Sequence, residues 1–103
     1  MADPMRIRAA LVGDKVDVKI LMAHEMETGL RKDGEGNVVP ARYIVNVSAT
    51  CNERTVLSAL WGASVAKNPF LAFRFTGAAK GDKLKVTWTD SDGDTRTDEV
   101  VIG

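Results

Sequence analysis

Apolar and polar residues alternate along most of this chain, and this alternation constrains the fold more than any other feature of the sequence. In the segment KVDVKILM, residues 15–22, every second residue is apolar and most of those between are charged. A strand turns successive side chains to opposite faces, so a period of two is typical of a strand buried on one face. No long segment keeps the helical period of 3.6. The sequence therefore predicts an all-β domain.

Seven such segments are separated by residues that favour turns. They cover residues 5–12, 15–22, 42–50, 55–61, 70–75, 83–89 and 95–102. Short turns such as Gly13-Asp14 predict that neighbouring segments pair as hairpins. In the segment 70–75 we expect Leu71, Phe73 and Phe75 to face the core, because the other face contains an arginine. Seven short strands at near-regular spacing are typical of an immunoglobulin-like or fibronectin-like β-sandwich.

The composition limits the class of protein. A chain of 103 residues has room for one core, so we expect a single domain over residues 1–103. Fourteen basic residues balance fourteen acidic ones, which disfavours binding to nucleic acid or to anionic membranes. No apolar run is long enough to cross a bilayer, and arginines interrupt the beginning of the chain where a signal peptide would need an apolar core. We therefore expect no membrane span and no export signal in this chain.

The segment MAHEMETGLRKDGEG, residues 22–36, interrupts the alternation and contains the only histidine. We expect a long loop over residues 24–39, and loops of this length are usually functional or mobile. If residues 22–26 stay extended, Met22, His24 and Met26 share one face, where thioethers and an imidazole would suit Cu(I). The alternative is that both methionines extend the apolar stripe of the preceding strand, because methionine commonly fills cores and interfaces.

Two other motifs are better explained as turns than as ligand sites. DSDGD, residues 90–94, resembles the start of an EF-hand loop, but Thr95 stands where that loop needs glycine and Val101 where it needs glutamate. A hairpin turn at Asp92-Gly93 explains the same residues. GAAKGDK, residues 77–83, lacks the spacing of a phosphate loop and precedes a strand and not a helix.

No catalytic constellation is visible, and we expect neither enzymatic activity nor a cofactor. Cys51 is the only cysteine, so an internal disulfide is excluded. Arg54 lies close enough in sequence to stabilise a reactive thiolate, although such a cysteine is more often structural, and a bridge to another chain stays open. Trp61 and Phe70 flank a polar connection, and such aromatic residues are enriched at interface hot spots. Together with Met22, His24 and Met26, they are the candidate partner-binding residues.

Three segments resemble the SoxZ family of the bacterial sulfur-oxidising (Sox) system. They read PMRIRAALVGDKVDVKILMAHEMETGLRKD, WGASVAKNPFLAFRF and GDKLKVTW. The likeness covers nearly all of the chain in order, and the Met-Glu-Thr-Gly and Lys-Asn-Pro motifs within these segments are fairly specific.

The resemblance implies a non-enzymatic β-sandwich subunit that forms a heterodimer with SoxY. In that complex SoxY carries the sulfur intermediates of thiosulfate oxidation on a cysteine of its flexible C-terminal tail, a role that cannot be transferred to Cys51. A cytochrome, a dehydrogenase and a hydrolase would dock transiently on the complex. The complex is periplasmic, and the export signal belongs to SoxY, which would explain the absence of a signal in this chain. In such a complex we expect the 24–39 loop to belong to the partner surface or to the docking site of those enzymes, with its charges giving orientation more than affinity.

Overall fold

The computed structural model describes residues 3–62, 65 and 67–103, and these residues form seven strands and no helix. The strands are β1 (Arg6–Val12), β2 (Lys15–Leu21), β3 (Ile44–Cys51), β4 (Arg54–Leu60), β5 (Phe70–Thr76), β6 (Lys83–Asp90) and β7 (Thr95–Val101). Each predicted strand is present, with ends that differ from the prediction by two residues at most. No helix in the described part of the chain is long and apolar enough to span a bilayer.

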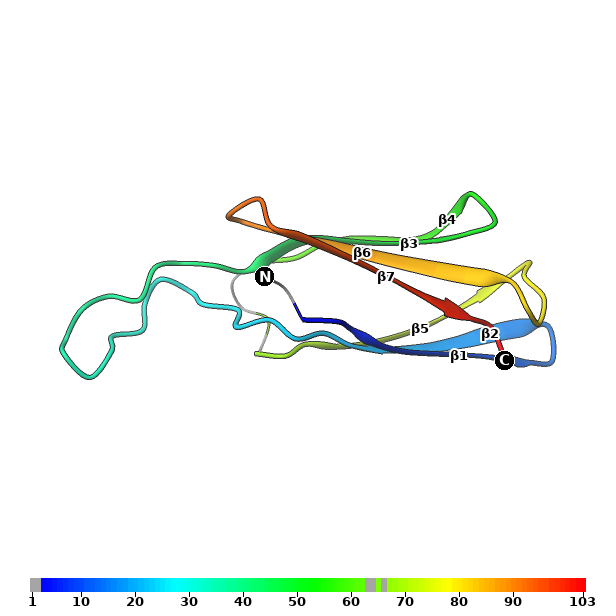
Figure 1. The fold of residues 1–103 in the computed structure, drawn as a ribbon, viewed down its shortest axis with the longest axis horizontal. Coiled ribbons are helices and arrows are strands. Elements are labelled where there is room, and N and C mark those ends of the chain that lie inside the picture. Colours follow the sequence, from blue (N-terminus) through cyan, green and yellow to red (C-terminus); the bar gives the residue numbers. More distant parts are fainter. Residues whose placement is uncertain (1–2, 63–64, 66) are drawn as a thin grey trace.

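The strands form two antiparallel sheets that pack face to face (Figure 1). One sheet has the order β1-β2-β5 and the other β4-β3-β6-β7. The chain crosses between the sheets after β2, β4 and β5, whereas β1–β2, β3–β4 and β6–β7 are hairpins. Asn52 and Glu53, between β3 and β4, both have positive φ, as a tight two-residue hairpin turn requires. The predicted β-sandwich of immunoglobulin-like type is confirmed.

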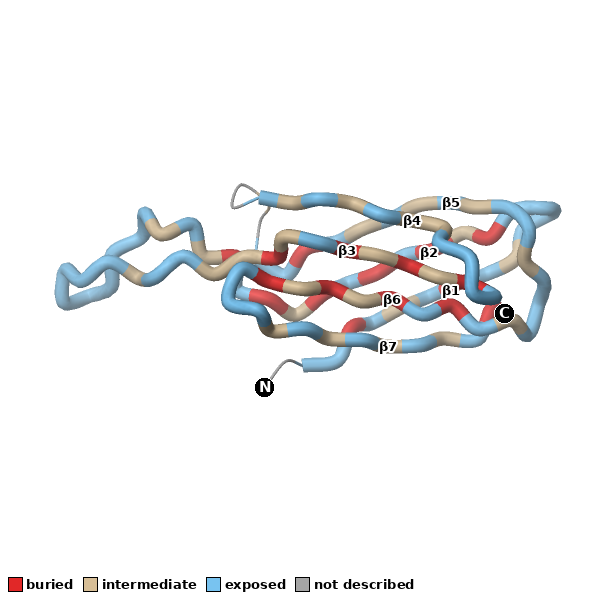
Figure 2. The backbone as a smooth tube through the Cα atoms, turned by 90° about the horizontal axis from the view of Figure 1, so that it is seen from above, coloured by how far each residue is buried: buried red, intermediate tan, exposed pale blue. Residues whose placement is uncertain are grey.

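The core lies between the two sheets and is built from the inward members of the alternating pattern (Figure 2). The fully buried side chains come mainly from the central strands β2, β3 and β6, because these strands have neighbours on both edges. On β5 the predicted inward set of Leu71, Phe73 and Phe75 is confirmed, although these side chains are only partly buried.

Residues 22–43, which we call the arm, begin and end at the sandwich, and their middle part extends well beyond its end (Figure 1). With the arm, the molecule measures 53 × 21 × 20 Å. The predicted loop is more regular than expected: antiparallel bridges join Glu27 to Arg42 and Lys32 to Val38, so the arm is an irregular hairpin ribbon. At its tip the Asp33 carboxylate accepts hydrogen bonds from the backbone N–H groups of Glu35 and Asn37.

Candidate partner-binding site

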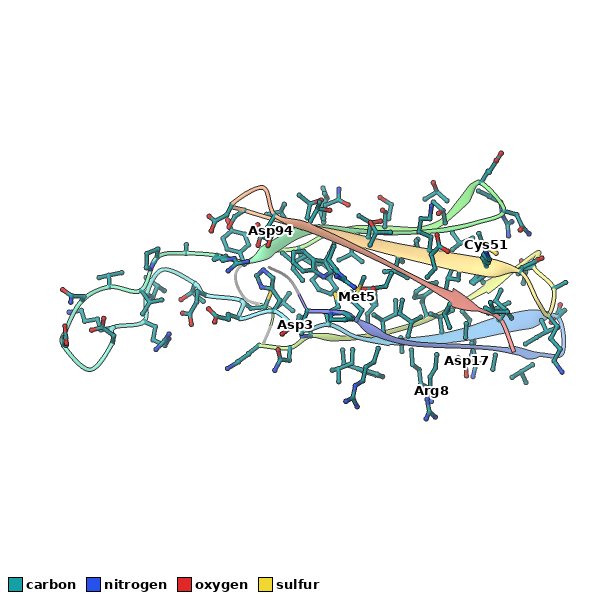
Figure 3. All side chains as sticks on the ribbon, in the orientation of Figure 1. Asp3, Met5, Arg8, Asp17, Cys51 and Asp94 are labelled. Atoms are coloured by element: carbon teal, nitrogen blue, oxygen red, sulfur yellow. The ribbon has the colours of Figure 1, made fainter. Side chains whose placement is uncertain are left out.

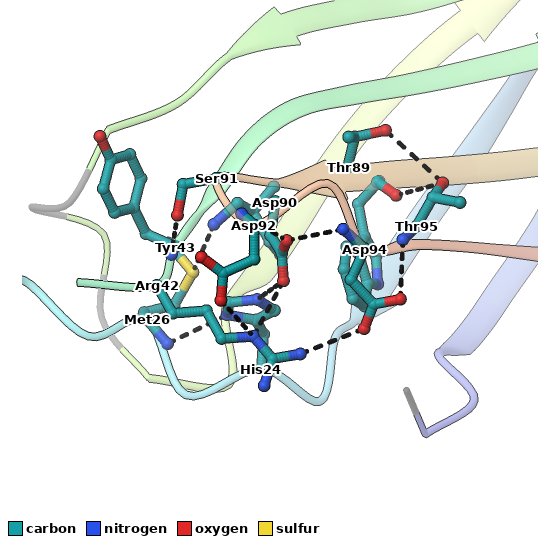
Figure 4. A network of polar contacts seen from close by, with 12 residues as sticks. His24, Met26, Arg42, Tyr43, Thr89, Asp90, Ser91, Asp92, Asp94 and Thr95 are labelled. Atoms are coloured by element: carbon teal, nitrogen blue, oxygen red, sulfur yellow. Dashed lines mark hydrogen bonds and ion pairs between the residues drawn. The ribbon is translucent and has the colours of Figure 1, made fainter. Parts of the chain in front are cut away.

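The arm is fixed to the sandwich by a buried polar network, which we call the arm root (Figure 4). Asp90, the last residue of β6, is its centre. One carboxylate oxygen of Asp90 lies 3.0 Å from Nε2 of His24 and 3.0 Å from Nε of Arg42. The carboxylate is fully buried, as is nearly all of the His24 side chain. The network therefore joins both ends of the arm to the last residue of a core strand.

The hydrogen bonds of His24 define its tautomer. Nδ1 accepts the backbone N–H of Met26 at 3.0 Å, so the ring proton is on Nε2, which donates to Asp90. The backbone N–H of His24 donates to Oδ1 of Asn68, and its carbonyl accepts the N–H of Asn68. The ring also contacts Trp88 edge-on, with centroids 5.0 Å apart. Both ring nitrogens are thus engaged within the protein.

Met22 and Met26 lie in the core beside this network. Met22 is completely buried, and Met26 adopts positive φ, with its sulfur accepting the backbone N–H of Ile44 at 3.4 Å. Met22, His24 and Met26 are all buried, but the condition of the prediction is not met, because β2 ends at Leu21 and Met26 is not extended. Their thioethers and imidazole serve packing and hydrogen bonding, and His24 has no free lone pair for a metal. The geometry argues against the Cu(I) interpretation.

The DSDGD segment forms the predicted turn, and Arg42 is bound across it. The second Asp90 oxygen accepts the N–H groups of Asp92 and Asp94, while Gly93 has a φ of 85°. Nη2 of Arg42 donates to the Asp94 carboxylate at 3.1 Å. Among the residues that the structure describes, no three histidine, cysteine or carboxylate side chains group as metal ligands.

The ionisation of the root follows from these contacts. Burial raises the pKa of Asp90, but the hydrogen bonds from His24, Arg42, Asp94 and Asp92 outweigh it and leave the pKa below its usual range. The hydrogen bond to Asp90 raises the pKa of Arg42. A buried carboxylate is therefore held ionised by a guanidinium and by backbone and imidazole N–H donors. Asp90 and Arg42 thus form a charge pair that holds the root together.

A cavity of about 190 Å³ borders the root, lined by Asp3, Ala23, His24, Glu25, Arg42, Asn68 and Trp88. Ligand pockets of enzymes commonly enclose about 300–1,000 Å³. Two of the lining residues, His24 and Arg42, are already hydrogen-bonded to the Asp90 carboxylate. The cavity is therefore a poor candidate for a cofactor site.

The other sequence motifs are structural. Cys51 is 2% exposed at the end of β3, and burial, with a further contribution from Asp82, raises the pKa of its thiol. Arg54 donates to the Thr76 carbonyl, and its charge lowers the pKa of the thiol by less than burial raises it. A neutral, buried thiol is neither nucleophilic nor accessible to another chain. In residues 77–83, Asp82 accepts the N–H of Ala79 and closes a turn, as predicted.

The sandwich is incompletely closed between β4 and β5, the edge strands of the two sheets. Within the described residues no backbone hydrogen bond joins these strands. Partly buried apolar side chains line this opening, which we call the seam: Val56, Leu57, Trp61, Leu71, Phe73 and Phe75. Phe70 lies at its rim and is 63% exposed. Residues 63, 64 and 66 of the polar connection between Trp61 and Phe70 lie outside the described residues.

The candidate partner-binding residues of the sequence thus divide into two groups. Met22, His24 and Met26 are buried at the arm root, so they position the arm and present no surface of their own. Trp61 and Phe70 lie at the seam, where a partner can reach them. On the arm, Leu30 is 86% exposed and Val38 is also exposed, so apolar surface continues away from the sandwich.

The fold and these surfaces define an immunoglobulin-like β-sandwich with a projecting arm and an uncovered apolar seam. The family model of the sulphur oxidation protein SoxZ matches residues 5–101, and the chain belongs to this family.

Among solved structures, a superoxide reductase (neelaredoxin) from Archaeoglobus fulgidus, the E12V variant in the reduced form, has a similar fold. The two are 17% identical with a TM-score of 0.50, over 95% of this chain and 84% of that chain. This likeness concerns the fold alone. Comparison with curated protein sequences gave no significant match.

Proposed function

We propose that this chain is the non-catalytic subunit of a SoxYZ carrier complex. It binds and stabilises SoxY, which carries thiosulfate-derived sulfur intermediates on a C-terminal cysteine while thiosulfate is oxidised to sulfate. The family match over residues 5–101 carries the proposal. It is supported by the buried state of Cys51 and by the engagement of both ring nitrogens of His24, which leave these groups unsuited to covalent chemistry.

The seam is the surface that we assign to SoxY. Interfaces of permanent complexes are large, and their centres are more apolar than the remaining surface. The seam combines two unpaired strand edges with aromatic and aliphatic side chains that the chain itself covers only in part. Trp61 and Phe70 stand at one end of it, where they can act as anchors in pockets of SoxY. SoxY would cover the apolar side chains of the seam that are only partly buried in this chain.

The arm would extend the same contact. A two-stranded ribbon without a core of its own is marginally stable in water, yet this ribbon exposes Leu30 and Val38 beyond the sandwich. The buried root fixes where the ribbon leaves the domain, and this lowers the entropy lost when a partner covers it. We therefore assign the apolar side chains of the arm to SoxY, with its charges setting orientation more than affinity.

Co-expression with SoxY followed by size-exclusion chromatography tests the proposal. We expect the two chains to elute together at the volume of a heterodimer, and to stay together at high salt because an apolar contact is little screened. Separate elution of two folded chains would contradict the subunit role.

We further propose that the complex works in the periplasm, exported together with SoxY. Fractionation of cells that express the chain with and without SoxY tests this: the chain should reach the periplasm only when SoxY is present. Periplasmic chain without SoxY would contradict co-export.

A further inference from the structure

The outward face of the β1-β2-β5 sheet concentrates positive charge. Alternate residues of these strands point away from the core, and Figure 3 shows Arg8 and Asp17 on this side. Five of the outward side chains are cationic and one is a carboxylate. We call these residues the basic face: Arg6, Arg8, Lys15, Lys19 and Arg74, with Asp17. Because the whole chain is neutral, this is a local excess.

The stability of the isolated sheet does not explain this arrangement. Arg8 is directly opposite Lys19 across the β1–β2 pair, and like charges in this position destabilise a sheet. Arg74 pairs with Asp17 at 3.2 Å. Among the residues that the structure describes, no carboxylate forms an ion pair with the other four cations of the face. Their charge is therefore available to a partner.

The outward face of the other sheet is different in kind. Its strands present mostly threonine and serine, and Oγ1 of Thr87 is hydrogen-bonded to that of Thr97. Its Lys85 is paired with Glu99. Lys83 is exposed on this side as well, but the larger charge excess lies on the outward face of the β1-β2-β5 sheet.

The basic face ends in an apolar area next to the arm. Leu21 is 42% exposed and is flanked by Arg6 on one neighbouring strand and Phe70 on the other. Beside Leu21 the surface has a hollow of about 330 Å³, lined by Pro4, Arg6, Leu21, Met22, Ala23 and Asn68. A hollow of this size accepts one or two apolar side chains. Lipid headgroups and phosphodiesters are polar and would make no favourable apolar contact in it.

We propose that the basic face is a docking surface for an acidic protein that inserts an apolar side chain into the hollow beside Leu21. The inference rests on the proposed function: SoxY covers the seam, with Phe70 at its rim, and the part of the arm beyond Met26, whereas the cations of the basic face and the hollow beside Leu21 stay open for proteins that act on the complex. Unpaired charges on such a surface steer association and fix orientation without making the contact permanent. The hollow beside Leu21 favours a protein over nucleic acid, because it offers apolar contact that a phosphodiester backbone cannot use.

Two pairs of substitutions test the docking surface. Arg8→Glu with Lys19→Glu reverses two charges at the centre of the basic face. Lys80→Glu with Lys83→Glu makes the same change of net charge at exposed lysines away from it. Neither pair alters a buried contact, and circular dichroism verifies folding. The probe is a fluorescein-labelled peptide of about twelve residues, in which pairs of glutamates are separated by single leucines, titrated by anisotropy with the SoxY-bound chain.

At about 50 mM salt we expect the Arg8/Lys19 variant to bind the peptide roughly tenfold more weakly and the Lys80/Lys83 variant to stay within about twofold of the original. Leu21→Ser should weaken binding about threefold, because it removes apolar contact at the hollow. Equal losses in both charge variants would overturn the proposal. So would binding to phosphatidylglycerol vesicles or to a duplex oligonucleotide as tight as binding to the peptide.

Co-elution with SoxY separates this inference from the proposed function. The Arg8/Lys19 variant should keep SoxY; if it releases SoxY, the basic face is part of the SoxY interface and the proposal of a separate docking surface is wrong. If the unaltered chain fails to bind SoxY, the proposed function fails. The same peptide titration is then carried out on the chain alone. Weaker binding by the Arg8/Lys19 variant would support the docking surface, and unchanged binding would overturn it.

Discussion

The arm root and the seam lie in the same small sandwich but differ in how completely their groups are satisfied. At the root, the Asp90 carboxylate, the ring of His24 and the backbone around them have hydrogen-bond partners within the chain. At the seam, apolar side chains of β4 and β5 are only partly covered and both strand edges are unpaired. The comparison separates a region that fixes geometry from a region that the chain leaves for a partner.

The largest effect is expected at the root. Asp90→Ala removes the four hydrogen bonds that the carboxylate accepts and leaves the half-buried Arg42 without its main partner. The free energy of unfolding should therefore fall by about 3–5 kcal/mol. Chemical denaturation measures this. Asp92→Ala is the matched control: its exposed carboxylate lies 3.8 Å from Nε of Arg42, and because an exposed ion pair contributes little, stability should change by less than about 0.5 kcal/mol. Equal effects of the two substitutions would mean that the root does not fix the arm.

At the seam the expected effect is on binding and not on stability. Phe70→Ala should weaken SoxY binding roughly 30-fold, or about 2 kcal/mol, because an exposed aromatic residue at the rim of an apolar surface is a typical hot spot. The unfolding free energy should change by less than about 0.5 kcal/mol. Val101→Ala is the control: it is 56% exposed, but it lies on β7 at the opposite edge of its sheet. Surface plasmon resonance with immobilised SoxY compares the affinities of the two variants. Equal losses of affinity would contradict the assignment of the seam to SoxY.

A smaller change in the free energy of unfolding is expected when the pH is lowered. The pKa of Asp90 is lower in the folded chain than its usual value near 4, so its ionised form contributes stability above about pH 4, and this contribution is lost as the pH falls through the folded pKa. Asp98 behaves likewise, because Arg96 and the N–H of Met5 bind its carboxylate and lower its pKa. Urea denaturation between about pH 7 and 3 should show a shallower acid loss for Asp90→Asn than for the unaltered chain. Parallel curves would show that the root does not depend on this charge.

The sequence predicts the strands well because alternation and turn residues are local signals. The inward phase of β6 runs through Leu84, Val86 and Trp88, and one more step reaches Asp90. The alternation therefore indicates that Asp90 is buried, whereas the surrounding aspartates indicate a turn. In the structure Asp90 is both buried and the first residue of the turn. Arg42 and His24 could not be paired with it from the sequence, because they are 48 and 66 residues away.

The basic face was missed for a related reason. Its cations are spread over three strands, two of which are adjacent in the chain and one of which is far along it. The balanced total charge concealed them, since charge counting does not assign residues to faces. Once the register places Arg8 against Lys19 and Asp17 against Arg74, the excess is evident. The seam could not be predicted either, because which strands become edges depends on the order of strands in the two sheets.

The smallest effect is expected from Cys51, which lies far from the arm at the other end of the sandwich (Figure 3). Cys51→Ala removes one buried sulfur and should lower stability by only about 1 kcal/mol. Because its thiol is buried and its pKa raised, thiosulfate oxidation by the reconstituted Sox proteins should proceed at an unchanged rate. The unaltered chain should react with a thiol reagent such as dithionitrobenzoate only when urea unfolds it. Lost turnover in a folded Cys51→Ala variant would place covalent chemistry in this chain, and then neither the root nor the seam would be its functional region.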